Sequence, residues 1–205
     1  MKIAYAAVAA LALAAPAVAA DFSGPRVEAT VGWDNPRLKI DLNNVAARGH
    51  DDGVVYGGEA GYDLRFSNLV VGALAGVEGS SVKDCEVSNL GRTCLKAGRN
   101  FAVGARAGVV VSPRVLLYGK AEYVNVRLRG AFDDTVNAAN SFSGHDDRGG
   151  YRLGAGGELA LSPHLYVKAE YRYSDYKKYR LDDGTTTAGA DLSRHQVVGG
   201  VGLRF

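Results

Sequence analysis

Beyond residue 20 this chain lacks any apolar run long enough for a transmembrane helix. Without such a run it is either soluble or crosses a membrane as a closed barrel, because only helices and barrels satisfy every backbone polar group in lipid. Charge of one sign is also lacking: without Lys2, 23 of the 24 basic residues remain against 22 acidic ones. A nearly neutral chain lacks the field that attracts nucleic acid, so we expect no nucleic-acid partner.

The first 20 residues have the composition of a secretory signal peptide. Lys2 supplies a positive charge, Ile3–Ala15 form an apolar run too short to span a bilayer, and small residues follow Pro16. We expect cleavage after Ala19 or Ala20. No cysteine follows that site, so we expect no lipoprotein anchor. Residues 1–20 are therefore excluded from the fold, and residues 21–205 should form one domain.

What the chain does have is glycine and tyrosine, 27 and 11 residues, which suit many strands better than helices. Eight segments alternate with a period of two, the pattern of a strand between two unlike environments. Most run about 11 to 14 residues, which matches a tilted membrane crossing. They are Gly24–Asp34, Val54–Phe66, Leu69–Gly79, Arg99–Val111, Val115–Gly130, Gly150–Leu161, Leu165–Lys178 and Arg194–Phe205.

The connections alternate in length. Three are tight turns of residues that favour turn geometry, Ser67–Asn68, Ser112–Arg114 and Ser162–His164. Four are long and polar, Asn35–Gly53, Ser80–Gly98, Ala131–Gly149 and Tyr179–Ser193. This pattern predicts an all-β fold, an eight-stranded antiparallel up-and-down transmembrane β-barrel with short periplasmic turns and four long external loops.

The two faces of the predicted strands differ, one being aliphatic and the other rich in glycine and charge. Aromatic residues of the aliphatic face gather near the long loops: Trp33, Tyr56, Phe101, Tyr123, Tyr151 and Tyr173. Phe66 and Phe205 mark the opposite end of that face. Two aromatic girdles around a band of valine, alanine and leucine describe a surface that faces lipid. A simple preference of strands for aromatics would not sort them by height.

The charged face would then line the lumen, which side chains fill in an eight-stranded barrel. Because buried charges must be paired, we expect a cross-strand network of ion pairs and hydrogen bonds. The same residues could instead line a path for ions or small solutes, and this alternative stays open. The predicted network comprises Glu28, Glu59, Arg106, Lys120, Glu122, Glu158, Lys168, Glu170 and Arg172, and Asp63 shares their face.

Two features of the predicted loops contain residue types that can form a disulfide or bind a metal. Cys85 and Cys94 lie in the second long loop, and export to an oxidising compartment predicts a disulfide between them. Gly-His-Asp-Asp occurs twice, at residues 49–52 and 144–147, and both residue types bind metals. The strands that follow lie on opposite sides of an eight-stranded barrel. We therefore interpret the repeats as turn chemistry and expect no metal.

Two further features lie at the barrel rim. Arg127 and Arg129 face outward above the apolar band, where they either pair with lipopolysaccharide phosphates or simply stay hydrated. Ser193 and His195 share an outward face, with Asp191 nearby, as a lipid hydrolase would need. We interpret this second set as chance proximity in one strand. We expect no catalytic residues and no cofactor.

The last strand, His195–Phe205, ends on an aromatic and resembles the terminal strand of bacterial outer-membrane barrels. Together with Ser162–Tyr176, it resembles the small alphaproteobacterial outer-membrane surface antigens of the opacity-type porin family, which are similar to the barrel of outer-membrane protein A. The resemblance covers essentially the whole mature chain. It implies a Gram-negative outer-membrane location with extracellular loops, and Phe205 as the signal read by the barrel-assembly machinery. With nothing after Phe205, we expect no peptidoglycan-binding domain.

Four functions compete on this basis. The first is a structural surface protein, not an enzyme, whose partners are outer-membrane lipid, lipopolysaccharide and a host or environmental ligand at the loops. A small porin-like channel is the second, and a measurement of conductance would distinguish it from the first. The third is a haem-binding or adhesive receptor, with His50 and His145 as the loop ligands for haem. An outer-membrane lipid enzyme that uses Ser193 and His195 is the last.

Overall fold

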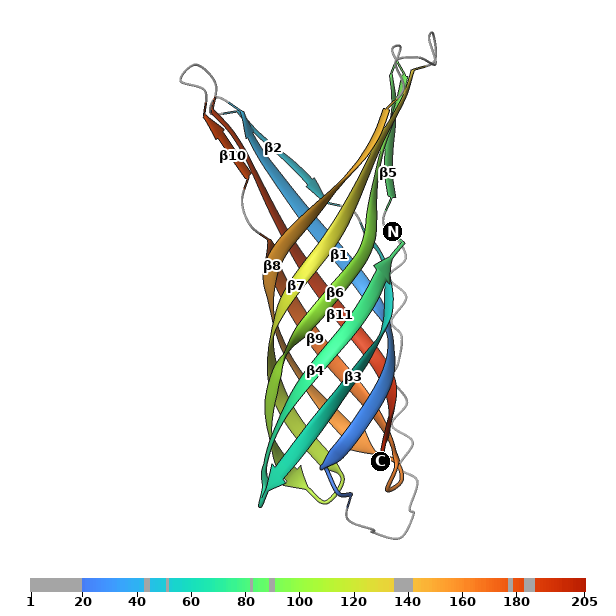
Figure 1. Ribbon diagram of the computed structural model, residues 1–205, viewed down its shortest axis with the longest axis vertical. Helices are drawn as coiled ribbons and strands as arrows, with labels where there is room; N and C mark the ends of the chain where they lie inside the picture. The colour runs from blue at the N-terminus through green and yellow to red at the C-terminus, as the bar shows by residue number, and fades with distance from the viewer. Residues whose placement is uncertain are drawn as a thin grey trace, which may run out of the picture.

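The computed structural model describes residues 20–42, 45–50, 52–81, 83–88, 91–134, 142–176, 179–182 and 187–205. Within these ranges, side chains are described for residues 20–37, 52–81, 98–127, 148–176 and 192–205. The described chain is an antiparallel β-barrel whose strands cross the long axis at a pronounced tilt (Figure 1). Among the described residues, no helix is long and apolar enough to span a membrane.

Eight long strands close the wall in the order β1, β3, β4, β6, β7, β8, β9 and β11, and β11 pairs back onto β1. This confirms the predicted eight-stranded antiparallel barrel. Three short strands, β2, β5 and β10, pair with the extended ends of β1, β6 and β11. The strands are β1 Gly24–Leu42, β2 Val45–His50, β3 Gly53–Phe66, β4 Leu69–Ser80, β5 Lys83–Ser88, β6 Gly91–Ser112, β7 Val115–Asp134, β8 Phe142–Ala160, β9 Leu165–Tyr176, β10 Tyr179–Asp182 and β11 Thr187–Arg204.

The barrel has a turn end and a loop end. Tight connections join β3 to β4, β6 to β7 and β8 to β9 at the turn end, where the C-terminus also lies (Figure 1). At the loop end the strands run on well past the expected boundaries, and β6 and β7 reach 22 and 20 residues. The four long loops were therefore predicted with the wrong extent, because strands occupy part of each of them: Asn35–Gly53, Ser80–Gly98, Ala131–Gly149 and Tyr179–Ser193. A paired ribbon satisfies its backbone groups without a packed face, so its sequence needs no period-two alternation.

Exposure alternates along the strands as two unlike faces require. In β9 every second residue is buried, and the residues between them are half-buried or exposed. The outward set is apolar, with Val31, Leu117 and Val197 each more than half exposed. The inward set is polar, and Arg26, Arg152 and Arg172 are among its largest fully buried side chains. The aliphatic band therefore faces outward and the charges face the lumen.

Glycine allows this narrow wall to curve. A Cβ atom on the inward Gly104 would lie 2.1 Å from the Ala121 carbonyl oxygen of the next strand, and other inward glycines are similarly crowded. On the outward Gly119 and Gly199, the nearest atoms would be 3.7 and 3.9 Å away. Inward glycines thus stand where the neighbouring backbone leaves no space for a side chain, as expected at tight bends of a barrel.

The barrel closes where its first and last strands meet. The Phe205 amide donates a hydrogen bond to the Pro25 carbonyl at 2.9 Å. Beside it, Gly24 has a φ of 101°, and a Cβ atom there would lie 2.2 Å from the Phe205 carbonyl oxygen. Both the conformation and the close approach require glycine at this position.

Candidate functional site: a closed, charge-filled lumen

The lumen of the described barrel holds equal numbers of buried acids and bases. Counted over the side chains that the structure describes, eight of each are buried. Equal numbers allow every charge a partner, as burial demands. The bases are Arg26, Arg106, Lys120, Arg152, Lys168, Arg172, Arg194 and Arg204, and the acids are Glu28, Asp34, Glu59, Asp63, Glu78, Glu122, Glu158 and Glu170.

Asp63 is the hub of the network near the turn end. Its two carboxylate oxygens accept hydrogen bonds from Arg106, at 2.9 Å from Nε and 2.5 Å from Nη2. Arg204 Nη2 donates to Asp63 at 3.2 Å, and Arg26 Nε lies 3.3 Å from the same carboxylate. Glu158 accepts from Arg106 and, at 3.0 Å, from Arg204. Three arginines therefore share this aspartate, and each of them also pairs with a glutamate.

Glu59 and Glu28 extend this network of ion pairs and hydrogen bonds toward the middle of the lumen. Glu59 accepts hydrogen bonds from Arg26 at 2.7 Å and from Lys120 at 2.8 Å. Glu28 accepts from Arg26 at 2.9 Å, from the Tyr166 hydroxyl at 2.8 Å and from Lys168. These contacts join residues up to 140 positions apart in the sequence, across several strands.

Glu170, on β9, is a second hub of the network. The Tyr118 hydroxyl donates to it at 2.6 Å, and Arg172 also donates to its carboxylate. The Lys120 and Lys168 ammonium groups lie 2.9 and 3.1 Å from its oxygens. A single carboxylate thus accepts hydrogen bonds from three side chains and forms an ion pair with Lys120, which suits strong charge-assisted bonds.

Nearer the loop end the pairing centres on Glu78 and Asp34. Arg152 donates to Glu78 at 2.7 Å, and Arg172 donates to its other oxygen. Asp34 accepts from Arg194 and, at 2.7 Å, from the Ser80 hydroxyl. No side chain in any of these lumen ion pairs is more than 7 % exposed.

An apolar cluster closes the lumen at each end of the charged network. The turn-end cluster comprises Ala20, Phe22, Val70, Leu116, Tyr118 and Ala160, with Val110 packed against it. The loop-end cluster comprises Ala102, Val124, Val126 and Tyr176, with Leu192 packed against it. Among the described residues, mainly apolar side chains therefore lie toward each end of the polar core, and the Tyr118 hydroxyl in the turn-end cluster is bonded to Glu170.

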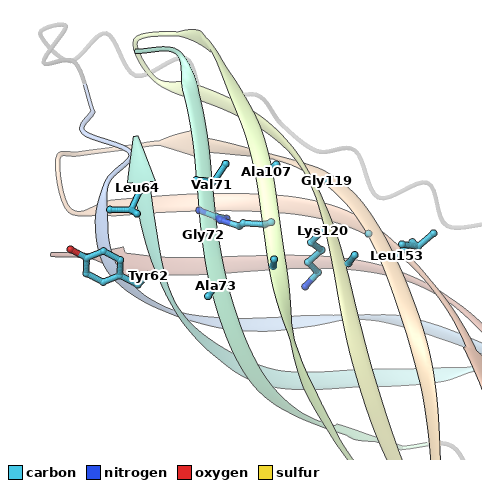
Figure 2. A pocket seen from close by; sticks show the side chains of 13 residues that line it. Tyr62, Leu64, Val71, Gly72, Ala73, Ala107, Gly119, Lys120 and Leu153 are labelled. Atoms are coloured by element: carbon cyan, nitrogen blue, oxygen red, sulfur yellow. The ribbon is translucent and has the colours of Figure 1, made fainter. Parts of the chain in front are cut away.

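The outer wall carries a shallow groove of about 910 Å³ that spans β3 to β8 (Figure 2). Its floor consists of small residues, and larger apolar side chains border it. Arg106 and Lys120 also touch it, but their charged ends are paired inside the lumen. The groove is therefore part of the lipid-facing band. Its floor includes Ala73, Ala105, Ala107, Gly119 and Ala121, and its borders include Tyr62, Leu64 and Leu153.

The predicted aromatic girdle lies on the outer wall toward the loop end. Its members Trp33, Tyr56, Phe101, Tyr123 and Tyr151 are 47–56 % exposed, and Tyr173 is half-buried. Two of these side chains lie against glycines of the neighbouring strand. A Cβ atom on Gly79 would lie 3.0 Å from the Tyr56 ring, and one on Gly149 would lie 2.3 Å from the Tyr123 hydroxyl.

The structure places each remaining candidate as follows. In the β5–β6 register the backbone of Cys85 lies opposite that of Cys94, and their side chains lie outside the described residues. Directly opposed positions of an antiparallel pair are close enough for a disulfide, which stays a prediction. The side chains of His50, His145 and Arg129 also lie outside the described residues. In the described part, no cluster of three or more His, Cys, Asp or Glu could hold a metal.

At the rim, the His195 imidazole contacts a residue other than Ser193, whose hydroxyl it would have to activate in a hydrolase. His195 Nδ1 lies 2.7 Å from the Tyr171 hydroxyl, and the Tyr173 ring centre lies 5.0 Å from the imidazole centre. The imidazole therefore belongs to the aromatic girdle. No contact in the described residues activates Ser193 as a nucleophile through this ring.

The sequence-based network omitted several residues that the structure places in the lumen. For those within the predicted strands the signal is parity alone, because they alternate with residues of the outward face. Asp34 and Glu78 stand near the predicted strand ends, where inward direction is hardest to assign. Phe22 precedes the first predicted strand and has no periodic signal at all. The omitted residues are Arg26, Asp34, Glu78, Arg152, Arg194, Arg204, the tyrosines Tyr118 and Tyr166, and Phe22.

A closed eight-stranded barrel with an apolar outer band, an aromatic girdle and a paired polar interior defines an outer-membrane barrel protein. The family model of the outer membrane protein beta-barrel domain matches residues 4–205. The chain belongs to this family, which confirms the predicted family and the outer-membrane location.

Curated relatives support the same assignment. The chain is 30 % identical over 180 residues to the 31 kDa outer-membrane immunogenic protein of Brucella melitensis, covering 84 % of this chain and 72 % of the relative. It is 31 % identical over 156 residues to the 22 kDa outer membrane protein of Rhizobium leguminosarum bv. viciae, covering 73 % of this chain and 66 % of the relative. These relatives are named as outer-membrane proteins, and the Brucella protein as immunogenic.

Two solved structures share the fold. Neisserial surface protein A matches with a TM-score of 0.51 at 17 % identity, covering 89 % of this chain and 98 % of that one. The outer membrane protease OmpT of Escherichia coli matches with a TM-score of 0.50 at 10 % identity, covering 89 % and 97 %. At these identities the likeness shows the fold alone, so the protease activity of one neighbour says nothing about this chain.

Proposed function

We propose that this protein is a non-conducting structural protein of the outer membrane, with its turn end in the periplasm and its long ribbons and loops outside the cell. One observation carries this proposal: the eight acids and eight bases of the lumen are paired, buried and capped by apolar clusters. Such an interior acts as a polar core, which suits a scaffold that presents loops to the exterior.

The runner-up, a small channel, needs a continuous path of water beside its charged side chains. Here those side chains point at one another, and the lumen ion pairs named above leave no side chain more than 7 % exposed. Moving an ion through would require several pairs to separate in a low-dielectric interior, where each separation is costly. The geometry therefore favours the scaffold over the channel.

Conductance tests this choice directly. The purified, folded protein added to a planar bilayer should give no stable single-channel steps above those of its detergent alone. A heat-denatured sample in the same detergent serves as the control for bilayer damage. Uniform, long-lived steps that appear only with the folded protein would show a water path and would favour the channel instead.

We propose further that the protein is not an enzyme. Its curated relatives are named as outer-membrane proteins, and the Brucella protein as immunogenic. The described residues support this, because the rim imidazole of His195 is bonded to Tyr171. A haem-binding or adhesive role of the loops has no described side chain in its favour.

Lipid is the partner that the outer wall supports best. Arg99 faces outward and exposed at the girdle, and its guanidinium lies 5.4 Å above the Phe101 ring centre. A cation held over an aromatic ring at headgroup height suits the phosphates of lipopolysaccharide. The sequence suggested Arg127 and Arg129 for this contact. Arg127 is half-buried and interacts with other groups of the protein. We therefore propose Arg99 as the better candidate.

Replacing Arg99 with glutamine should lower the lipopolysaccharide retained per purified barrel by roughly 1.4-fold to fivefold, because an exposed ion pair contributes about 0.2–1 kcal/mol. Quantitative mass spectrometry of the bound lipid measures it. Arg114→Gln removes the same charge at the turn end and serves as the matched control. Equal lipid retention in both variants would contradict a headgroup contact at Arg99.

Assembly is the last role that we propose, for the C-terminal strand. Phe205 is 69 % exposed, and its amide makes a backbone hydrogen bond to Pro25. The ring lies on the outward face like the other exposed aromatics, and we propose that before closure this strand pairs with the barrel-assembly machinery by strand addition.

A further inference from the structure

A short segment before β1 folds into the turn end of the lumen. Ala20 is 4 % exposed and Phe22 is completely buried, although neither belongs to a strand. Asp21, between them, is exposed. An aromatic buried ahead of the first strand is not needed to build the wall, so its position requires another explanation.

Phe22 occupies the centre of the turn-end cluster. Its ring belongs with Val70, Leu116 and Ala160, which come from β4, β7 and β8. On the lumen side, the Arg204 guanidinium lies 5.3 Å from the ring centre, and this arginine is bonded to Asp63 and Glu158. The ring therefore separates the charged network from the open end of the barrel.

Two turns fasten the backbone of the segment. The Ala20 amide donates to the Pro113 carbonyl at 3.0 Å, in the β6–β7 turn. Arg65 Nη1, beside the β3–β4 turn, donates to the Ala20 carbonyl at 3.2 Å. Within residues 20–23 the described backbone has no ladder pairing, unlike the strands around it. A few contacts hold this segment, so it can leave the lumen without opening the wall.

We propose that residues 20–23 form a stopper at the turn end, with the Phe22 side chain as its seal against water. The stopper keeps the ion pairs around Asp63 in a low-dielectric environment, where charge-assisted bonds are strongest. When the segment detaches, water and small polar solutes reach the lower lumen while the barrel stays closed. Cleavage after Ala19 keeps both contacts of Ala20, whereas cleavage after Ala20 removes them and leaves residues 21–23, with Phe22, as the stopper. The proposal does not depend on conductance, since the charged network blocks the lumen with or without the stopper.

Access of a water-soluble thiol reagent to the lumen tests the stopper. In a Cys85→Ser, Cys94→Ser background, one reporter cysteine replaces Ala160 in the turn-end cluster, and a separate protein carries it in place of Ala102 in the loop-end cluster. Phe22→Ala should raise the labelling rate at the Ala160 position by roughly tenfold or more, since truncating a buried phenylalanine removes the packing that holds the segment. The rate at the Ala102 position should not change.

Phe66→Ala is the matched control, because Phe66 is an exposed aromatic on the outer wall at the same end of the barrel. It should leave both labelling rates unchanged. Unchanged labelling at the Ala160 position in Phe22→Ala would overturn the stopper, as would an equal rise at both reporter positions, which indicates a loosened barrel. Should Phe22→Ala fail to fold, Phe22→Val keeps an apolar side chain and should give a smaller rise confined to the Ala160 position. No rise in that variant would also overturn the proposal.

Discussion

Replacing Asp63 with asparagine should lower the free energy of unfolding by about 3–5 kcal/mol, the usual cost of removing one partner from a buried ion pair. The substitution keeps the shape of the side chain and removes its charge. Arg106, Arg204 and Arg26 would then share one fewer anion inside a lumen where acids and bases are balanced. The large effect follows from the stranded charge rather than from lost packing.

Urea-induced unfolding in lipid vesicles measures this loss. Trp33 is the single tryptophan and lies half-exposed in the outer girdle, so its fluorescence reports the passage from lipid to water. Asp175→Asn is the matched control, because this aspartate faces outward and accepts one long hydrogen bond of 3.3 Å from Tyr173. The control should change stability by less than about 0.5 kcal/mol. Equal, small effects of the two substitutions would show that the lumen network contributes no net stability.

A double variant separates charge imbalance from the loss of any particular bond. Asp63→Asn combined with Arg204→Gln restores equal numbers of acids and bases, and Glu158 keeps its bond to Arg106. The double variant should lose less stability than the sum of the two single variants, as expected for coupled neighbours. A strictly additive result would mean that each side chain acts independently and that balance has no role.

The periodicity of the sequence predicted the architecture because lipid and lumen impose opposite requirements on alternate residues. That constraint ends where the wall leaves the membrane, which explains why the strands run into segments expected to be loops. The period-two pattern also does not predict which residues pair with each other across the lumen. Arg152 and Glu78 are 74 positions apart, on β8 and β4, and the strand tilt that brings them together cannot be derived from either strand alone.

Two other features had no signal in the alternation. Phe22 lies outside every period, and its burial depends on a closed barrel with an open lower end. In the sequence, the inward glycines were apparent only as a high glycine content. The distances between neighbouring strands show why glycine is needed at these positions. Most inward glycines have the neighbouring backbone where a side chain would be. The outward Gly119 and Gly199 have space, and the outward Gly79 and Gly149 are approached only by tyrosine side chains.

Adding one methyl group on the two faces should therefore have opposite consequences. Gly104→Ala places a Cβ atom 2.1 Å from the Ala121 carbonyl oxygen and 2.7 Å from the Glu122 Cα, both of them backbone atoms that cannot rotate away. We expect a loss of about 3 kcal/mol or more in the free energy of unfolding, the upper range for overpacking. The same vesicle unfolding measurement would detect it.

Gly199→Ala is the matched substitution on the lipid face, where the nearest atom lies 3.9 Å from the new Cβ. It should change stability by no more than about 0.5 kcal/mol. Because both substitutions reduce the freedom of the unfolded chain equally, that contribution cancels from the comparison. The difference between the two variants then measures the steric cost of curvature alone. If Gly104→Ala were as stable as Gly199→Ala, the wall could relax by local shifts, and curvature would not be the reason for the inward glycines.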